Sequence, residues 1–336
     1  MSSARAKPAS GRLRAITVSA LGVALICYLV KQVGIRAVLV PASSVGWGGF
    51  ALLCAAVILV YVVVGVGWGI LQPPSSGARM LVFIWARMVR EAAADVLPFS
   101  QIGGMALGLR AAILQSVPLN LALATMAVDL ATEFLAQIAY VAFSVLVIWE
   151  SLPHTPLAAD VVLGSCIWLL GALLASAAFL ALQRYGHRWV AGRFIGRLIP
   201  RSARYSAGVV SALDEIYGSL KRFTSSLGLH LLGWFANAAC TWIAFRLIGA
   251  SVELSSVVAL EALVYATRTV GFFVPGALGV QEAAYTAFAQ LFGIGRELAL
   301  AVSLLKRARD LAVGVPVLLI WKTIEGRRAL AGGDAH

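Results

Sequence analysis

Apolar residues run through most of the chain in continuous stretches separated by polar and basic segments. Six stretches are long enough to cross a hydrocarbon core of about 30 Å as helices: residues 15–35, 45–71, 118–149, 160–183, 226–249 and 298–322. The stretches are continuous rather than alternating, which is typical of spanning helices and not of the strands of a β-barrel. The pattern therefore predicts an all-α polytopic membrane protein with about six full spans.

Two further apolar stretches are interrupted by proline and glycine. The break residues are Pro98, Gly103 and Gly104 in the first stretch, and Pro275, Gly276 and Gly279 in the second. Proline blocks helix continuation, while glycine permits turns that other residues resist. Because unpaired backbone at membrane depth survives only where protein or water covers it, the breaks predict two re-entrant hairpins. Eight ordinary spans with two kinks are the alternative interpretation.

The segment before the first break supports a hairpin. Residues 79–97 carry Arg87, Arg90, Glu91 and Asp95, so this stretch cannot cross a membrane alone. We interpret it as a half-helix that enters the bilayer, ends at the break and returns.

The two breaks fall at corresponding places in two halves of the chain, about 15–149 and 160–322. Each half is expected to contain two spans, one broken hairpin and a closing span. From the charge distribution, the first half begins on the cytoplasmic side of the membrane and the second half begins on the outer side. Two halves with opposite orientation form an inverted-topology repeat. Broken helices in such repeats are the sequence-level indication of a transporter binding site.

The charge balance indicates orientation. The 336 residues are 60% hydrophobic and 12% charged, with a formal net charge of +12. The positive-inside rule assigns the tails 1–14 and 326–336 and the basic segment 184–225 to the cytoplasm, around one transmembrane domain at 15–325. No soluble basic domain is present, so we expect no nucleic-acid partner.

Known catalytic and metal-binding patterns are missing from the sequence. The four cysteines and four histidines are scattered, and none has metal-ligand spacing. There is no Ser-His-Asp arrangement, Walker loop or dinucleotide fingerprint. We therefore expect no metal, no cofactor and no enzyme activity.

The last span is unusual because it carries charges near its middle. Lys306, Arg307, Arg309 and Asp310 lie within an otherwise apolar run. Asp310 offsets only part of the positive charge, so we expect the surplus to bind an anionic group such as lipid phosphate. The alternative is that these cations pair with carboxylates elsewhere and lock the helices together.

Further charged residues are candidates for the same site. Arg110 and Arg268 lie at comparable positions beside the two breaks and are expected to contact substrate with the three cations of the last span. Five carboxylates are expected to balance charge or to couple transport: Asp129, Glu133, Glu261, Glu282 and Asp310. Asp129 and Glu133 share a helix face because they are four residues apart.

These motifs carry a resemblance to a known family. Residues 97–104, the helix with Asp129 and Glu133, residues 269–282 and residues 306–310 resemble the flippase-like membrane domain of lysylphosphatidylglycerol synthases. The likeness extends over about 15–325, and the chain is most similar to the stand-alone hopanoid-biosynthesis-associated membrane proteins. The family often has an acidic residue after the first glycine pair, where this chain has Met105.

The resemblance implies translocation of a lipid between the leaflets of a bacterial inner membrane. We expect an anionic or amphiphilic lipid, with hopanoid-related lipids among the candidates, to pass between the hairpins while the halves rock. The soluble aminoacyl-transfer domain of the full synthases is not expected. A membrane scaffold for a lipid- or hopanoid-modifying complex, acting through residues 184–225, is the alternative, and a homo-oligomer is left open.

Overall fold

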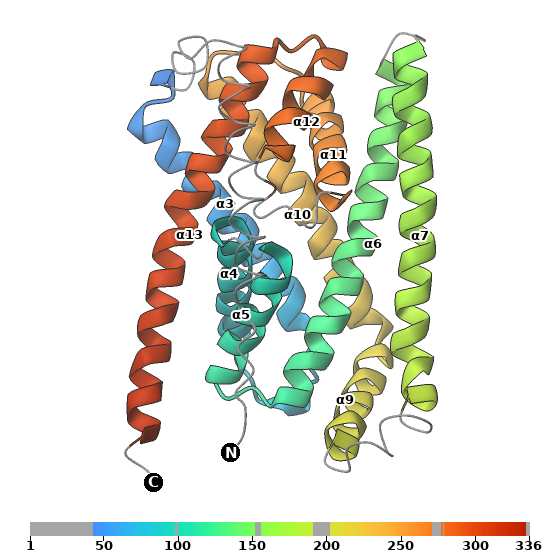
Figure 1. The fold of residues 1–336 in the computed structure, drawn as a ribbon, viewed down its shortest axis with the longest axis vertical. Helices are drawn as coiled ribbons and strands as arrows, with labels where there is room; N and C mark the ends of the chain where they lie inside the picture. Colours follow the sequence, from blue (N-terminus) through green and yellow to red (C-terminus); the bar gives the residue numbers. More distant parts are fainter. Residues whose placement is uncertain are drawn as a thin grey trace, which may run out of the picture.

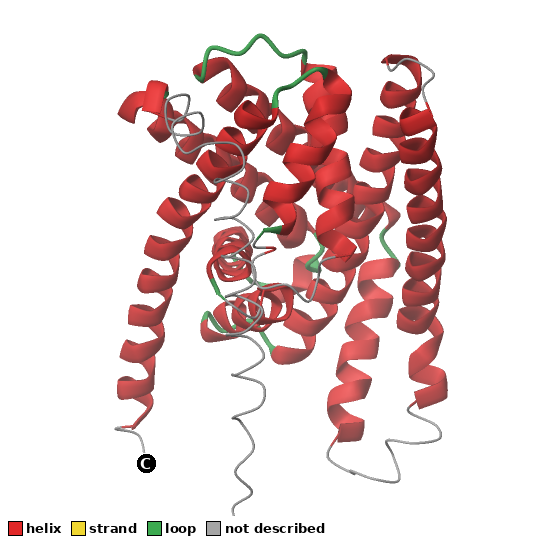
Figure 2. Cartoon of the chain, turned by 45° about the horizontal axis from the view of Figure 1, so that its top comes forward, coloured by secondary structure: helices red, strands yellow, loops and turns green. Residues whose placement is uncertain are grey.

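The computed structural model describes residues 43–97, 100–151, 156–190, 202–270, 277 and 279–333. Within these ranges the regular elements are helices joined by short loops (Figures 1 and 2). In chain order they are α3 (Gly46–Ile70), η1 (Pro74–Ser76), α4 (Met80–Val96), α5 (Ser100–Leu114), α6 (Leu119–Ser151), α7 (Pro156–Val190), α9 (Ser202–Tyr217), α10 (Leu220–Leu247), α11 (Leu254–Val270), α12 (Val280–Phe288), η4 (Ala289–Phe292) and α13 (Arg296–Gly333).

Some sequence predictions fall on residues outside these ranges. They are the first span at 15–35, the tail 1–14, residues 191–201 of the basic segment, the last three residues of the chain, and the break residues Pro98, Pro275 and Gly276.

Four of the predicted spans are long apolar helices. Among the described residues, α3, α6, α7 and α10 are long and apolar enough to cross a membrane. They correspond to the predicted spans at 45–71, 118–149, 160–183 and 226–249. Helix α13 takes the place of the span at 298–322 and is 38 residues long. Helix α13 is not one of the four long apolar helices because charged residues interrupt its apolar sequence near the middle.

Short helices flank both predicted breaks. Helices α4 and α5 pack together, as do α11 and α12. The α4–α5 hairpin lies in the lower half of the molecule in Figure 1, and the α11–α12 hairpin lies in the upper half. Helices α4 and α11 have 17 residues each, fewer than the roughly 20 that a perpendicular span needs.

The glycines near the breaks have different roles. Gly279 is the N-cap of α12 with φ of 77°, a backbone conformation that favours glycine, and its N–H donates to Glu282 Oε2 at 2.9 Å. Gly103 and Gly104 instead lie inside α5, so their assignment to the hairpin break is wrong. A Cβ atom at Gly104 would lie 2.6 Å from the backbone oxygen of Arg90. Glycine at position 104 therefore permits the close approach of α5 to α4.

Substituting Gly104 by Ala should lower the Tm of the purified protein in detergent. The new methyl group meets backbone of α4, and such overpacking costs about 1 to 3 kcal/mol. Gly164→Ala on α7 is the matched control, because nothing lies within 4 Å of its Cβ position. Alanine is the better helix former by about 1 kcal/mol, so the control should keep or raise the Tm. Equal shifts in the two variants would contradict the close approach.

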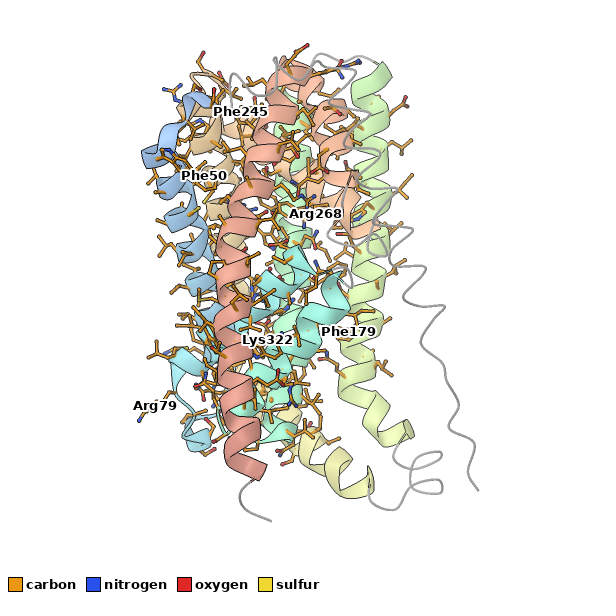
Figure 3. All side chains as sticks on the ribbon, turned by 60° about the vertical axis from the view of Figure 1, so that its left-hand side comes forward. Phe50, Arg79, Phe179, Phe245, Arg268 and Lys322 are labelled. Carbon is orange, nitrogen blue, oxygen red and sulfur yellow. The ribbon has the colours of Figure 1, made fainter. Side chains whose placement is uncertain are left out.

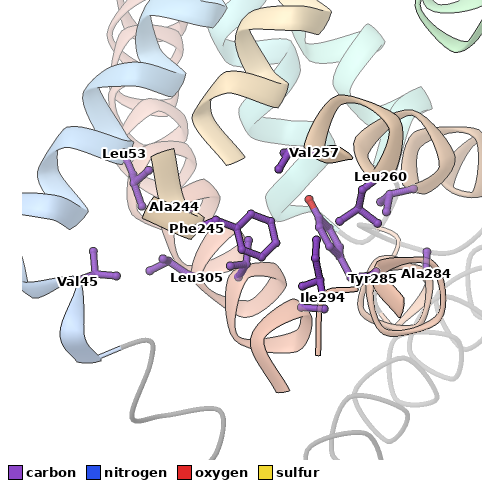
Figure 4. Packing of buried hydrophobic residues seen from close by; sticks show 14 residues of the cluster. Val45, Leu53, Ala244, Phe245, Val257, Leu260, Ala284, Tyr285, Ile294 and Leu305 are labelled. Atoms are coloured by element: carbon purple, nitrogen blue, oxygen red, sulfur yellow. The ribbon is translucent and has the colours of Figure 1, made fainter. Parts of the chain in front are cut away.

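Apolar clusters attach both hairpins to the long helices. Phe245 of α10, Leu260 of α11, Tyr285 of α12 and Leu305 of α13 belong to one cluster, which Figure 4 shows from close by. A second cluster joins α4 and α5 to α3, α6 and α13. This packing attaches α4, α5, α11 and α12 to the long helices.

Candidate functional site

A cavity of about 360 Å³ is lined by α4, α5, α11 and Ala277 together with the long helices α3, α6, α10 and α13. Its size falls in the range of small-molecule sites. Nine ionisable residues line the cavity: Arg87, Arg90, Glu91, Asp95, Glu133, His230, Arg268, Arg309 and Asp310. Leaving the histidine aside, four guanidinium groups face four carboxylates. The lining is therefore balanced in charge, which corrects the expectation of a surplus of positive groups.

The C-terminal ends of α4 and α11 meet at this cavity. Arg268 near the end of α11 has its Nη2 atom 3.6 Å from Oδ1 of Asp95, which is near the end of α4. Tyr61 of α3 donates its hydroxyl to Asp95 Oδ2 at 3.3 Å. The Arg268 guanidinium also lies over the ring of Tyr265, 5.3 Å from its centroid. Arg268 is in the central part of the molecule in Figure 3.

A buried cluster joins α4 to α6 and α10. Asp129 is fully buried, and its Oδ2 atom accepts from Arg87 Nη1 and Arg90 Nη1, each at 2.9 Å. Its Oδ1 atom is 2.9 Å from His230 Nε2. Glu133 accepts from Arg87 Nη2 at 2.5 Å and from Arg90 Nη2 at 2.7 Å. We name these five residues, which are Arg87, Arg90, Asp129, Glu133 and His230, the Asp129 cluster. Its carboxylates compensate the charges of the two arginines of α4, which are buried in the interior of the protein.

The cations of α13 are also paired. Lys306 Nζ lies 2.7 Å from both carboxylate oxygens of Glu261 and donates to the Tyr285 hydroxyl at 2.6 Å. The Tyr285 hydroxyl in turn donates to Glu261.

Two further pairs complete this arrangement. Arg307 Nη2 is 3.2 Å from Glu282 Oε1, and Arg309 Nη2 is 2.7 Å from Asp310 Oδ1. All three cations of the last span therefore have a carboxylate partner. Asp310 pairs with Arg309, while Lys306 and Arg307 pair with carboxylates elsewhere in the chain, as in the alternative interpretation.

The predicted site residues divide into three groups. Glu133, Arg268, Arg309 and Asp310 line the cavity. Asp129, Glu261, Glu282, Lys306 and Arg307 belong to ion pairs packed around it but are not in its lining. Arg110 is separate, because its side chain is 58% exposed and pairs with Glu325 of α13. The expected equivalence of Arg110 and Arg268 is thus wrong.

The cavity also contains residues that we had not assigned to the site. The sequence prediction uses four of them only as charges that prevent α4 from crossing the membrane alone: Arg87, Arg90, Glu91 and Asp95. Their spacing of three and four residues would have placed them on one helix face, and this signal could have identified them. His230 carried no comparable signal. Met105, which stands where the family often has an acidic residue, is also in the lining.

No metal-binding arrangement is visible in the described part of the chain, where no three His, Cys, Asp or Glu side chains are placed to hold an ion. What the cavity offers is a set of charged and hydroxyl groups enclosed by helices whose outer faces are apolar. Exposed leucines and isoleucines such as Leu59, Leu146 and Ile320 cover those faces. This arrangement suits a polar group that must be kept out of hydrocarbon.

Comparison with known proteins identifies the family of the chain. No curated protein and no solved structure gives a significant match. The family described as the lysylphosphatidylglycerol synthase TM region matches residues 14–317, which is most of the chain. Together with the long apolar helices, this match identifies a multi-pass membrane protein. The chain therefore belongs to the lysylphosphatidylglycerol synthase TM region family.

Proposed function

We propose that this protein is a non-enzymatic, flippase-like transporter that moves an amphiphilic lipid between membrane leaflets. Family membership indicates a membrane lipid-related function. The observation that carries the proposal is the charged cavity at which the ends of α4 and α11 meet. The polar head group passes through this cavity while the apolar tails stay in the bilayer.

The energetic argument starts from the cost of moving a head group through hydrocarbon. A charged group at the bilayer centre costs about 2.5 to 3.5 kcal/mol on insertion scales, and a head group with several polar atoms costs more. The cavity replaces the lost hydration with fixed guanidinium, carboxylate and hydroxyl groups. The barrier to leaflet exchange is lowered because the protein dipoles are already oriented.

In this proposal the two hairpins are re-entrant and belong to an inverted repeat. The lengths of the four short helices support it, since α4, α5, α11 and α12 have 17, 15, 17 and 9 residues. Their location in opposite halves of the molecule supports it as well (Figure 1). We further propose an inner-membrane location with both termini in the cytoplasm, and a hopanoid-related lipid among the candidate substrates.

Filling the cavity should stop lipid exchange. Gln101 of α5 is part of the cavity lining, and Gln101→Trp would occupy part of its volume. Its neighbour Ile102 is 64% exposed, so Ile102→Trp adds the same ring to the outer face as a matched control. The measurement is the rate at which acyl-labelled phospholipids become accessible to a membrane-impermeant quencher in vesicles containing the purified protein. We expect Gln101→Trp to approach the protein-free rate and Ile102→Trp to match wild type.

Two results would contradict this function. One is wild-type exchange no faster than in protein-free vesicles, for phospholipids and hopanoids alike. Such a result, with a phenotype in cells that depends on residues 184–225, would favour a scaffold instead. The other is equal exchange in the two tryptophan variants, which would place the lipid route outside the cavity.

A further inference from the structure

His230 of α10 is a buried imidazole with one unpaired ring nitrogen. It is 1% exposed and lines the cavity. Its Nε2 atom lies 2.9 Å from Oδ1 of Asp129, whose Oδ2 accepts from Arg87 and Arg90. Because an ionised carboxylate only accepts, Nε2 carries a proton. The Nδ1 atom has no hydrogen-bond partner among the described residues, so in the neutral ring it is a buried acceptor beside the cavity.

The ion pairs around the cavity contain one more carboxylate than cation, counted over the described residues. Six cations take part: Arg87, Arg90, Arg268, Lys306, Arg307 and Arg309. Seven carboxylates face them: Glu91, Asp95, Asp129, Glu133, Glu261, Glu282 and Asp310. The excess arises where the two arginines of the Asp129 cluster face three carboxylates, because Arg87 Nε also lies 2.7 Å from Glu91 Oε1. One proton on His230 therefore makes the whole arrangement neutral.

Charged and titratable groups reach this cavity from the elements around α10. They are Tyr61 of α3, Arg87, Arg90, Glu91 and Asp95 of α4, Glu133 of α6, Tyr265 and Arg268 of α11, and Arg309 and Asp310 of α13. Asp214 and Glu215 of the neighbouring α9 are exposed. Imidazole is the side chain whose charge ordinarily changes between about pH 5 and 8. His230 is therefore the group of the cavity that is suited to take up the balancing proton.

We propose that His230 is a proton-binding site that couples lipid movement to a proton, an inference that rests on the proposed function. Its Nδ1 atom takes a proton from water that reaches the cavity on one side of the membrane and returns it to water on the other side. Enclosing an excess charge costs free energy, so a conformation closed to water favours the protonated ring, and a hydrated one favours release. Proton binding thereby shifts the balance between conformations of the transporter.

The first test follows the protonation of the ring in the full chain in detergent. The substitutions His154→Gln, His187→Gln and His336→Gln together leave His230 as the only histidine. The measurement is the nitrogen NMR signal of the ring between about pH 5 and 8. We expect Nδ1 to become protonated as the pH falls, while Nε2 stays protonated. A ring that keeps one protonation state over this range would overturn the inference.

The second test uses vesicles that contain the purified protein and acyl-labelled phosphatidylglycerol, with the membrane potential clamped at zero. If one proton moves per lipid, a difference of about one pH unit should sustain up to about a tenfold difference in labelled lipid between the leaflets. His230→Gln keeps an N–H that can donate to Asp129 but cannot take up a proton, so the labelled lipid should be evenly distributed. His187→Gln, in the basic segment 184–225, is the matched control and should keep the wild-type distribution.

The outcomes separate this inference from the transport function. Wild-type exchange that ignores the pH difference, or a His230→Gln variant that still responds to it, would overturn the inference and leave the transport function intact. If His230→Gln does not fold, the wild-type response and the ring titration still decide. No exchange above protein-free vesicles would reject transport and its coupling together, and the titration alone would then decide whether His230 binds a proton.

Discussion

Replacing Asp129 by Asn should destabilise the protein by about 3 to 5 kcal/mol, as expected when one partner of a buried ion pair is removed. Asp129 is fully buried and accepts from Arg87, Arg90 and His230. Asparagine keeps the shape but loses the negative charge and one acceptor. Arg90 would then keep Glu133 as its carboxylate partner, and Arg87 would keep Glu133 and Glu91. Because the fully buried acceptor at position 129 loses its charge, both the Tm in detergent and the folded yield should fall sharply.

A matched control and a compensating variant make this prediction specific. Asp214 on α9 is exposed, so Asp214→Asn makes the same chemical change without burial and should keep the wild-type Tm. Adding Arg90→Gln to Asp129→Asn removes the guanidinium group that loses one of its two carboxylate partners when Asp129 is replaced. The double variant should therefore lose less stability than the two single losses added together. Additive losses, or equal Tm values for Asp129→Asn and Asp214→Asn, would show that the Asp129 cluster does not hold α4 in place.

The helices could be predicted from sequence because their signal is local. The continuous apolar run at 45–71 became α3, and the run at 118–149 became α6, with differences of one or two residues at the ends. Run length alone decides such a prediction, since about 20 apolar residues span the hydrocarbon core. The short α4 was equally predictable, because its charges Arg87, Arg90, Glu91 and Asp95 are incompatible with an independent span.

The pairing of charges could not be predicted in the same way. Helical spacing identifies only partners that lie three or four residues apart on one helix. The structure pairs Lys306 with Glu261 and Arg87 with Asp129, which are 45 and 42 residues apart. Such pairs depend on how helices from different parts of the chain pack, and a local sequence pattern does not indicate which helices will be neighbours. The predicted positive surplus disappeared for that reason.

The position of Arg110 shows a related limit. Its place after the first break suggested a counterpart of Arg268, but sequence position does not decide which face of α5 is directed toward α4. Gly104 and Gly108 form that face, since a Cβ at either would lie within 3 Å of an atom of Arg90. Arg110 lies elsewhere on the helix and pairs with Glu325. Glycines at a close helix contact could have indicated the inward face.

The second large effect is expected at the buried pair of α11 and α13. Glu261 is fully buried and Lys306 is 4% exposed, and the Lys306 ammonium lies within 2.7 Å of both Glu261 oxygens. Lys306→Met removes the cation and leaves a buried carboxylate with the Tyr285 hydroxyl as its remaining donor. We expect a loss of about 3 to 5 kcal/mol, measured as a lower Tm and a lower folded yield in detergent.

Removing both charges should restore most of this stability. In Lys306→Met with Glu261→Gln, no net charge stays buried, and the Gln side chain keeps an oxygen that can accept from Tyr285. Neutral replacements of a buried ion pair are often tolerated or stabilising, so the double variant should have a Tm close to that of wild type. Lys322→Met controls for the same substitution at an exposed position of α13 (Figure 3). If the double variant is as unstable as Lys306→Met, the lost stability comes from packing around the lysine stem rather than from an uncompensated carboxylate, and the ion pair does not join α11 to α13.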